Sequence, residues 1–326
     1  MLFHGLYILA TDPLIVSTFS GYPFKTKLAP SGKVLGEFPD NLSFPASFEP
    51  KYVLEHVPGW AVPVHRMAKF KARQILHRLE RREHSLLVNA PDENRVRQSF
   101  LIRGDRFSAN LYINEHLYKP LAEPKIYDAI YTAQLAAFKR LSLAKQVTNL
   151  MVVSYGGDLH AYCPELHHAD FNREFLPRPE LARKYNQAYA GLCLSAQEGA
   201  MLASCEYLLC GIPVVSTPSK GGRDQFFSPH NSIIVPPDPD RVAQAVEQWK
   251  AAPPDPTEIR QEVLGKINAL RLAYCTYIAK LIDRGGGGSK QPAALMEQYF
   301  NNPEGIATRF VKFADLQHVD LEKFSI

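Results

Sequence analysis

Residues 195–217 read SAQEGAMLASCEYLLCGIPVVST and decide the fold expected for this chain. Ser195 is a good helix N-cap, Gly211 suits the left-handed position that ends many helices, and Pro213 cannot continue a helix. The stretch therefore predicts a helix that stops before Gly211, followed by a short buried strand at 213–217.

Two carboxylates, Glu198 and Glu206, stand in this otherwise apolar helix. A helix that is apolar nearly all round is packed on every side. A buried carboxylate needs a partner, because leaving it unpaired costs on the order of several kcal/mol. Glu206 is expected to meet either a basic residue of its own domain or a ligand hydroxyl. Glu198 follows Ser195 by three residues, which is the spacing of a capping box and requires no ligand.

The spacing of the two carboxylates favours a ligand. Eight helical residues rise by roughly 12 Å, which is comparable to the distance from the sugar to the ribose in a nucleotide diphosphate sugar. If the helix begins after Glu198, the free N–H groups of Gly199, Ala200 and Met201 can bind the diphosphate, aided by the helix dipole.

The E-x7-E pattern followed by GIPVV resembles the donor-binding domain of retaining glycosyltransferases of family four, which have the two-domain GT-B fold. The resemblance spans about residues 125–250. It implies that Glu198 orients the donor sugar as a catalytic residue and that Glu206 binds the ribose.

The resemblance also implies a basic clamp on the diphosphate. A strand at 127–133 is followed by FKR, so Lys139 is the candidate catalytic cation and Arg140 a second donor-binding residue. The family usually has an Arg shortly before its Lys, and Gln134 stands there in this chain. The alternative is that Lys139 and Arg140 form the solvated start of a helix.

Further donor-binding candidates lie in two loops. Gly156 and Gly157 end a β-branched strand, and glycine lets the backbone approach a ligand closely. Leu176 and Arg178, in the segment FLPRPELARKYN, match the family loop that packs on the nucleotide base. Ordinary surface loop positions are the alternative for Leu176 and Arg178.

The order of the elements predicts the α/β class. Short apolar strands are expected at 127–133, 149–155, 191–195, 213–217 and 232–235, and helices at about 136–147, 179–190, 199–210 and 239–250. Such alternation gives a parallel sheet covered on both faces, with ligands at the carboxyl ends of its strands.

The chain is expected to be GT-B-like, with two Rossmann-like domains facing a cleft and a short first domain. The first domain is placed at 1–122 on the acceptor side, with strands at 6–10, 14–19, 85–90, 99–103 and 110–114 and an irregular stretch at 20–63. The nucleotide-sugar-binding domain is placed at 123–282. Residues 283–291, DRGGGGSKQ, are typical of an engineered Gly-Ser linker. The helix and tail at 292–326 are expected to pack back on the first domain.

Residues 65–84 carry seven Arg or Lys against two Glu, a net charge of +5 in a chain of net charge +4. Their apolar positions fall on one helical face, so the segment is a basic amphipathic helix suited to an anionic membrane surface or an anionic acceptor. The alternative is a solvated helix that covers the sheet of the first domain. No nucleic-acid motif or aromatic interleaving accompanies the charge, so nucleic acid is not an expected partner.

Composition predicts a globular enzyme. The 326 residues are 46% hydrophobic, and no apolar run reaches the roughly 18 residues of a membrane span. The N-terminus lacks signal-peptide features, so a cytoplasmic protein is expected, with membrane contact only at the inner face through residues 65–84. No cofactor and no metal are expected, since His167, His168 and Asp170 have no second ligand cluster beside them.

The resemblance implies transfer of a sugar from a nucleotide diphosphate sugar to a saccharide or lipid-linked acceptor with retention of configuration. His116 is a candidate cleft residue. Two alternatives remain: a GT-B sugar-nucleotide epimerase, and a non-catalytic sugar-nucleotide-binding protein.

Overall fold

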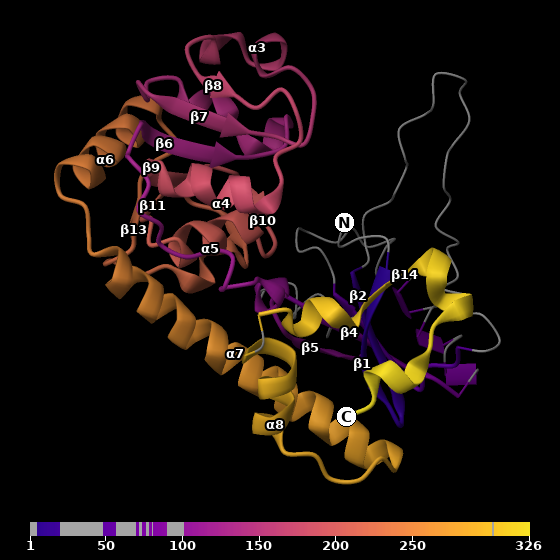
Figure 1. Ribbon diagram of the computed structural model, residues 1–326. Coiled ribbons are helices and arrows are strands. Elements are labelled where there is room, and N and C mark those ends of the chain that lie inside the picture. Colours follow the sequence, from indigo (N-terminus) through magenta and orange to yellow (C-terminus); the bar gives the residue numbers. More distant parts are fainter. Residues whose placement is uncertain are drawn as a thin grey trace, which may run out of the picture. The chain divides into compact units, whose positions relative to one another are not determined.

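The computed structural model describes residues 5–19, 48–56, 70–71, 74–75, 78–79, 81–89, 101–301 and 303–326. The chain forms two compact units, which are Met1–Ala109 together with Leu270–Ile326, and Asn110–Ala269 (Figure 1). Residues 110–122 and 270–282 thus lie in the opposite units from those expected. The first of these segments is tied to the second unit by Arg260, which donates hydrogen bonds to the carbonyl oxygens of Tyr118 (2.6 Å) and Glu115 (2.8 Å).

The first unit is built on a six-stranded mixed sheet in the order β14-β1-β2-β3-β4-β5. Strand β1 is antiparallel to both of its neighbours, and the pairs from β2 to β5 are parallel. The strands are β1 (Gly5–Thr11), β2 (Leu14–Phe19), β3 (Tyr52–His56), β4 (Glu83–Val88), β5 (Gly104–Arg106) and β14 (Phe310–Lys312).

Three expectations for this sheet were wrong. Strand β3 lies within the stretch expected to be irregular. It was not predicted because two of its five buried residues, Glu55 and His56, are polar. The strand expected at 110–114 is instead the 3-10 helix η1 (Ala109–Tyr112), and β5 begins at Gly104, just beyond the expected strand at 99–103.

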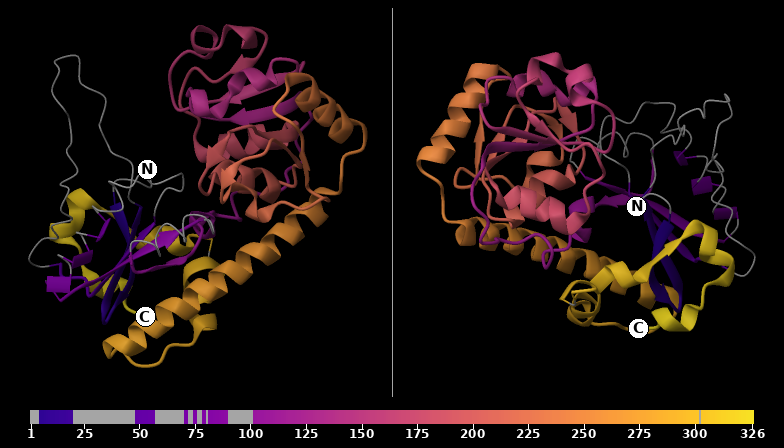
Figure 2. Two further views of the ribbon diagram at one scale, coloured as in Figure 1. Left: turned by 180° about the vertical axis from the view of Figure 1, so that it is seen from behind. Right: turned by 45° about the horizontal axis from the view of Figure 1, so that its top comes forward.

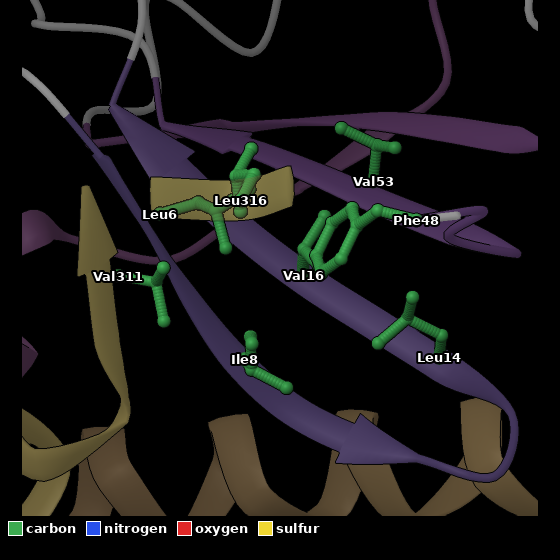
Figure 3. Close-up of a cluster of buried hydrophobic side chains, with 8 residues drawn as sticks. All are labelled: Leu6, Ile8, Leu14, Val16, Phe48, Val53, Val311 and Leu316. Carbon is green, nitrogen blue, oxygen red and sulfur yellow. The ribbon is translucent and has the colours of Figure 1, made fainter. Parts of the chain in front are cut away.

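The core of the first unit joins the two ends of the chain. Val311 of β14 and Leu316 of the 3-10 helix η8 (Phe313–His318) lie among side chains from β1, β2 and β3 (Figure 3). The Nη1 atom of Arg309 also donates to the carbonyl oxygen of Ile8 (3.0 Å). Residues 303–326 are therefore an integral part of this unit, because they add a strand to its sheet and side chains to its core.

The segment 283–291 begins as the end of a helix, and its origin as an engineered Gly-Ser linker stays a prediction. Helix α7 (Pro256–Gly285) ends in a Schellman motif, in which Gly286 N–H donates to Asp283 O (3.1 Å) and Gly287 N–H to Ile282 O (3.0 Å). Gly286 has φ +95°. A Cβ on Gly287 would lie 2.0 Å from the carbonyl oxygen of Asp12, so the run packs tightly on the β1–β2 turn.

The second unit contains an all-parallel sheet in the order β13-β11-β9-β6-β7-β8. Its strands are β6 (Tyr127–Thr132), β7 (Leu150–Val153), β8 (Asp170–Phe171), β9 (Ala188–Cys193), β11 (Val214–Ser216) and β13 (Ser232–Ile234). Numbered along the chain, this order is 6-5-4-1-2-3, the doubly wound Rossmann arrangement. The strand order reverses between β6 and β9.

Helices cover this sheet, as the views in Figure 2 show. Helices α4 (Arg178–Asn186) and α5 (Leu202–Leu209) pack on β9, and α6 (Pro239–Ala251) packs on β6, β9 and β11. Every residue of β6, β7 and β11 is buried, as expected for strands covered on both faces. The remaining short helices are α3 (Leu159–Tyr162) and, in the first unit, α8 (Pro292–Met296).

The helix expected at 136–147 does not form. Two 3-10 segments, η2 (Ala137–Lys139) and η3 (Leu141–Ala144), stand there, separated by Arg140 at φ 51°. Within the described ranges, no helix combines the length and the apolar character needed to cross a membrane.

Candidate functional site

The candidate site of the second unit lies at the carboxyl ends of β6 and β9, where the strand order reverses. In open α/β sheets ligands bind at this position, because the loops that leave the two strands diverge and open a crevice. The loop after β6 carries Lys139, and the loop after β9 carries Glu198.

Glu198 sits on a strand, whereas the sequence predicted a helix. Residues Gln197–Glu198 form β10, which pairs in parallel with β12 (Lys220–Gly221). Gly221 has φ +111°, and a Cβ there would lie only 1.7 Å from the carbonyl oxygen of Glu198. The pairing therefore depends on glycine at this position, and it prevents Ser195 from acting as a helix cap.

Lys139 and Glu198 form an ion pair between Nζ and Oε1, with side chains only 10% and 12% exposed. Tyr131 at the end of β6 donates its hydroxyl to the carbonyl oxygen of Lys139 (2.5 Å), which fixes the backbone beneath the ammonium group. Lys139 is therefore a buried cation held at the strand ends, and its reading as a solvated helix start was wrong.

Two arginines donate hydrogen bonds at the carboxyl ends of β9 and β11. Arg140 donates from Nε to Leu194 O (2.6 Å) and from Nη2 to Thr217 Oγ1 (2.7 Å), so it braces the loops after β9 and β11. Arg223, which is fully buried, donates to Cys193 O (2.8 Å) and to Thr217 O (2.6 Å). Arg223 was not predicted as a site residue, although it directly follows Gly221 and Gly222, and glycine pairs of this kind mark turns near a ligand or a close backbone contact.

Glu206 on α5 is held by tyrosines. Tyr185 donates its hydroxyl to Glu206 Oε2 (2.9 Å), and Tyr118 is a second hydroxyl donor. Burial raises the pKa of Glu206 above its ordinary value, while the hydrogen bonds from the tyrosines and the positive charge of Arg178 oppose that rise. Among the described residues, Glu206 makes no ion pair, in contrast to the basic partner considered from the sequence.

Thr132 connects two of the neighbouring tyrosine hydroxyls through buried hydrogen bonds. Thr132 lies within hydrogen-bonding distance of the Tyr185 hydroxyl (3.2 Å), and its backbone N–H donates to the Tyr207 hydroxyl (2.7 Å). Gly191 leaves room for the Tyr207 ring, since a Cβ there would lie 2.2 Å from the ring. The apolar pattern of the sequence did not predict that the hydroxyls of Tyr118 and Tyr185 both reach Glu206.

Gly199, Ala200 and Met201 precede helix α5 instead of forming its first turn. Met201 is the N-cap and has φ 40°, and α5 starts at Leu202. The Nδ2 atom of Asn110 donates to Ala200 O (2.9 Å), which anchors this loop from η1. Diphosphate binding by these backbone groups stays a prediction.

The remaining donor-binding candidates lie in loops at the surface of the second unit or at the start of α4. Gly156 and Gly157 are exposed after β7 with φ 144° and 91°, and a Cβ on Gly156 would meet nothing within 4 Å. Leu176 is half-buried, and Arg178 is exposed at the first position of α4. Of these four residues, only Arg178 affects the pKa of Glu206, which its positive charge lowers.

Other residues considered from the sequence lie apart from this site. His116 belongs to the second unit, whereas the first was expected, and its side chain is exposed. In the described part of the chain, no group of three or more His, Cys, Asp or Glu residues could hold a metal ion.

Comparisons with known proteins agree with this architecture. Residues 131–251 match a family profile described as glycosyl transferases group 1. A comparison with curated protein sequences finds no match.

The structure resembles sucrose-phosphate synthase (tll1590) from Thermosynechococcus elongatus, with 17% sequence identity and a TM-score of 0.52 over 74% of this chain and 69% of that one. It also resembles Anabaena Alr3699/HepE in complex with UDP, with 13% identity and a TM-score of 0.51 over 67% of each chain. The pneumococcal O-GlcNAc transferase GtfA, in complex with UDP and GlcNAc, shows 14% identity and a TM-score of 0.50 over 73% of this chain and 53% of that one. The chain therefore has the expected α/β, GT-B-like fold.

Proposed function

We propose that this chain is a glycosyltransferase that moves a sugar from a nucleotide diphosphate sugar to a saccharide or lipid-linked acceptor with retention of configuration. The observation that carries the proposal is the buried Lys139–Glu198 pair at the point where the strand order reverses. The family match over residues 131–251 covers both residues. UDP in the HepE and GtfA structures makes UDP-sugars the first donors to test.

The chemistry assigns each residue a part. The leaving diphosphate gains negative charge in the transition state, and the buried cation Lys139 stabilises that charge. The backbone N–H groups of residues 199–201 add donors beside it. Glu198 then accepts hydrogen bonds from the hydroxyls of the donor sugar, and Glu206 accepts those of the ribose.

The Lys139–Glu198 pair gives donor binding a definite first step. In the free protein the ammonium is neutralised by Glu198, and an incoming diphosphate competes for it. When Lys139 turns to the phosphate, the Glu198 carboxylate becomes available to the sugar hydroxyls. When Lys139 exchanges Glu198 for the phosphate, the two side chains thus bind the two groups joined by the sugar–phosphate bond that will break.

Retention follows from the resemblance and has its own test. In the family the leaving phosphate accepts the proton of the acceptor hydroxyl on the same face, so no carboxylate base is needed opposite the sugar. An α-linked donor should give an α-linked product, and the anomeric proton coupling of a freshly formed gluco-configured linkage measures this. A β-linked product would refute retention, and turnover of the donor without an acceptor would favour an epimerase.

We also propose that the reaction needs no metal ion, because Lys139 and backbone donors can neutralise the diphosphate. Transfer is expected to continue at an unchanged rate in excess EDTA. Loss of activity with EDTA and its return with Mn²⁺ or Mg²⁺ would contradict this.

A further inference from the structure

A second charged site lies wholly within the first unit. Among the residues that the structure describes, five cations and one carboxylate, Glu83, line a pocket of roughly 370 Å³. The cations are Lys71, Arg78, Arg81, Arg82 and Arg103. None of these residues belongs to the candidate donor site.

Glu83, the carboxylate among the described lining residues, is paired with two arginines. Glu83 Oε2 accepts from Arg103 Nη1 (3.3 Å) and from Arg284 Nη2 (2.9 Å). Arg78 and Arg81 make no side-chain hydrogen bond or ion pair with any residue that the structure describes. The pocket therefore presents unneutralised guanidinium groups, which bind phosphate oxygens in bidentate fashion.

The wall of the pocket is firmly built. Phe70 packs in a buried cluster with Leu86, Val88 and Ile102. Gln74, also buried, donates to His84 O (3.0 Å) and Arg103 O (2.8 Å) and accepts from Arg103 N–H (3.0 Å). The described helical residues among 70–79 are thus fixed to β4 and to the segment before β5.

Exposed apolar side chains accompany the cations. Ile75 and Leu101, which line the pocket, are 52% and 79% exposed, and Leu79, which follows Arg78 in the chain, is 77% exposed. Leu101 has φ 51°, a strained conformation for a bulky residue, and holds its side chain in solvent. Ile75 and Leu79, which were expected on the face that covers the sheet, are therefore exposed to solvent. Phe70 and Gln74 instead fix this segment to the sheet.

We propose that this pocket binds the phosphate head groups of an anionic lipid surface while Ile75, Leu79 and Leu101 enter the interface. Guanidinium groups next to exposed leucines suit a surface that is anionic outside and apolar beneath. A soluble phosphate would satisfy the arginines and leave the leucines in water, so the lipid surface is the better occupant. The inference is independent of the proposed transferase activity.

The test is co-sedimentation of the full chain with vesicles of phosphatidylcholine alone or containing phosphatidylglycerol. We expect binding only to the anionic vesicles, weakening as salt is added. Replacing two cations, Arg78→Gln with Arg81→Asn, should lower the partition coefficient by about 30-fold, since each surface cation contributes about 1 kcal/mol and 1.4 kcal/mol is tenfold. The matched control, Lys145→Gln with Arg241→Gln, removes the same charge from exposed positions of the second unit and should change binding far less.

A second variant separates insertion from charge. Leu101→Asn keeps the charge and suits the left-handed backbone, so it should fold normally and still lose several-fold in vesicle binding. Equal binding by wild type and both test variants would overturn the proposal. So would strong binding of inorganic phosphate without vesicle binding, or arginine-dependent binding of single-stranded RNA that exceeds vesicle binding at the same salt.

Discussion

At the scale of single residues, the site holds two glutamates in different environments. Glu198 pairs with Lys139 at the carboxyl ends of the strands, and Glu206 accepts hydrogen bonds from two tyrosine hydroxyls. In the first environment, a ligand can compete with the carboxylate for its lysine partner. The second favours hydrogen bonding and raises the pKa of the carboxyl group.

We expect Glu198→Gln to lower transfer by about 100-fold or more, the scale found when one transition-state partner is removed. Because the variant no longer neutralises Lys139, its affinity for UDP should rise by about fivefold, which corresponds to about 1 kcal/mol. Calorimetric titration with UDP and initial rates measure the two effects. Lower UDP affinity together with intact transfer per folded molecule would show that the pair is only structural.

Glu206→Gln should weaken UDP binding by about 10- to 100-fold, since a hydrogen bond to a charged group is worth about 1.5–3 kcal/mol. Its effect on stability has the opposite sign. The folded state retains the Glu206 proton to higher pH than the unfolded chain does, so the stability from this group is full below its ordinary pKa of 4.5 and falls as pH rises through the folded pKa.

Glutamine cannot ionise, so this variant should match the wild type in acid and melt at a higher temperature well above neutral pH. Thermal melts across the pH range, without ligand, give the difference. A variant that is less stable at alkaline pH would show that the ionised carboxylate stabilises the fold.

At the scale of elements, a pairing of two very short strands positions the proposed catalytic carboxylate. Strands β10 and β12 contain only two residues each, yet they set Glu198 beside Lys139. The close approach at Gly221 makes the pairing possible. Arg223 stabilises the neighbouring strand ends through carbonyl groups of β9 and of the residue after β11.

Gly221→Ala should lower transfer by about 100-fold, because an added Cβ would push β10 away and a displacement of about 1 Å at a reacting group can have that effect. Gly265→Ala is the matched control. That glycine lies within α7 with nothing within 4 Å of an added Cβ, and alanine there should stabilise the chain by about 1 kcal/mol. Full activity in Gly221→Ala would show that the β10–β12 pairing does not position Glu198 for catalysis.

At the scale of the whole molecule, each unit has its own sheet and its own core, and α7 begins in one unit and ends in the other. The first unit is closed by the last residues of the chain through β14 and Leu316. The second unit is formed from one continuous segment and holds all the donor-site candidates.

Scanning calorimetry should therefore resolve two transitions. UDP at a hundredfold excess over its Kd adds about 2.7 kcal/mol to the unit that binds it, so only the transition of the second unit should move upward. The Glu206→Gln variant, at the same UDP concentration, should show a smaller shift. A single transition, or equal shifts in both, would show that the units unfold as one.

The sequence by itself determined those features that depend on neighbouring residues. Strands β6, β7, β9, β11 and β13 lie where apolar periodicity predicted strands, whereas the helix expected at 136–147 is absent. The end of α5 follows from Gly211, which closes a Schellman motif as Ile212 N–H donates to Tyr207 O (3.0 Å). The E-x7-E spacing of Glu198 and Glu206, together with the GIPVV that follows it, indicated the resemblance from which the GT-B-like fold was predicted.

Tertiary structure alone decided the rest, because those features depend on partners distant in the chain. Glu198 leaves the predicted helix because β12 offers it backbone hydrogen bonds more than twenty residues away. Glu206 has hydroxyl partners because Tyr118 and Tyr185 arrive from two other segments. Local propensity contains no information about such pairings, and their hydrogen bonds outweigh it once the chain has folded.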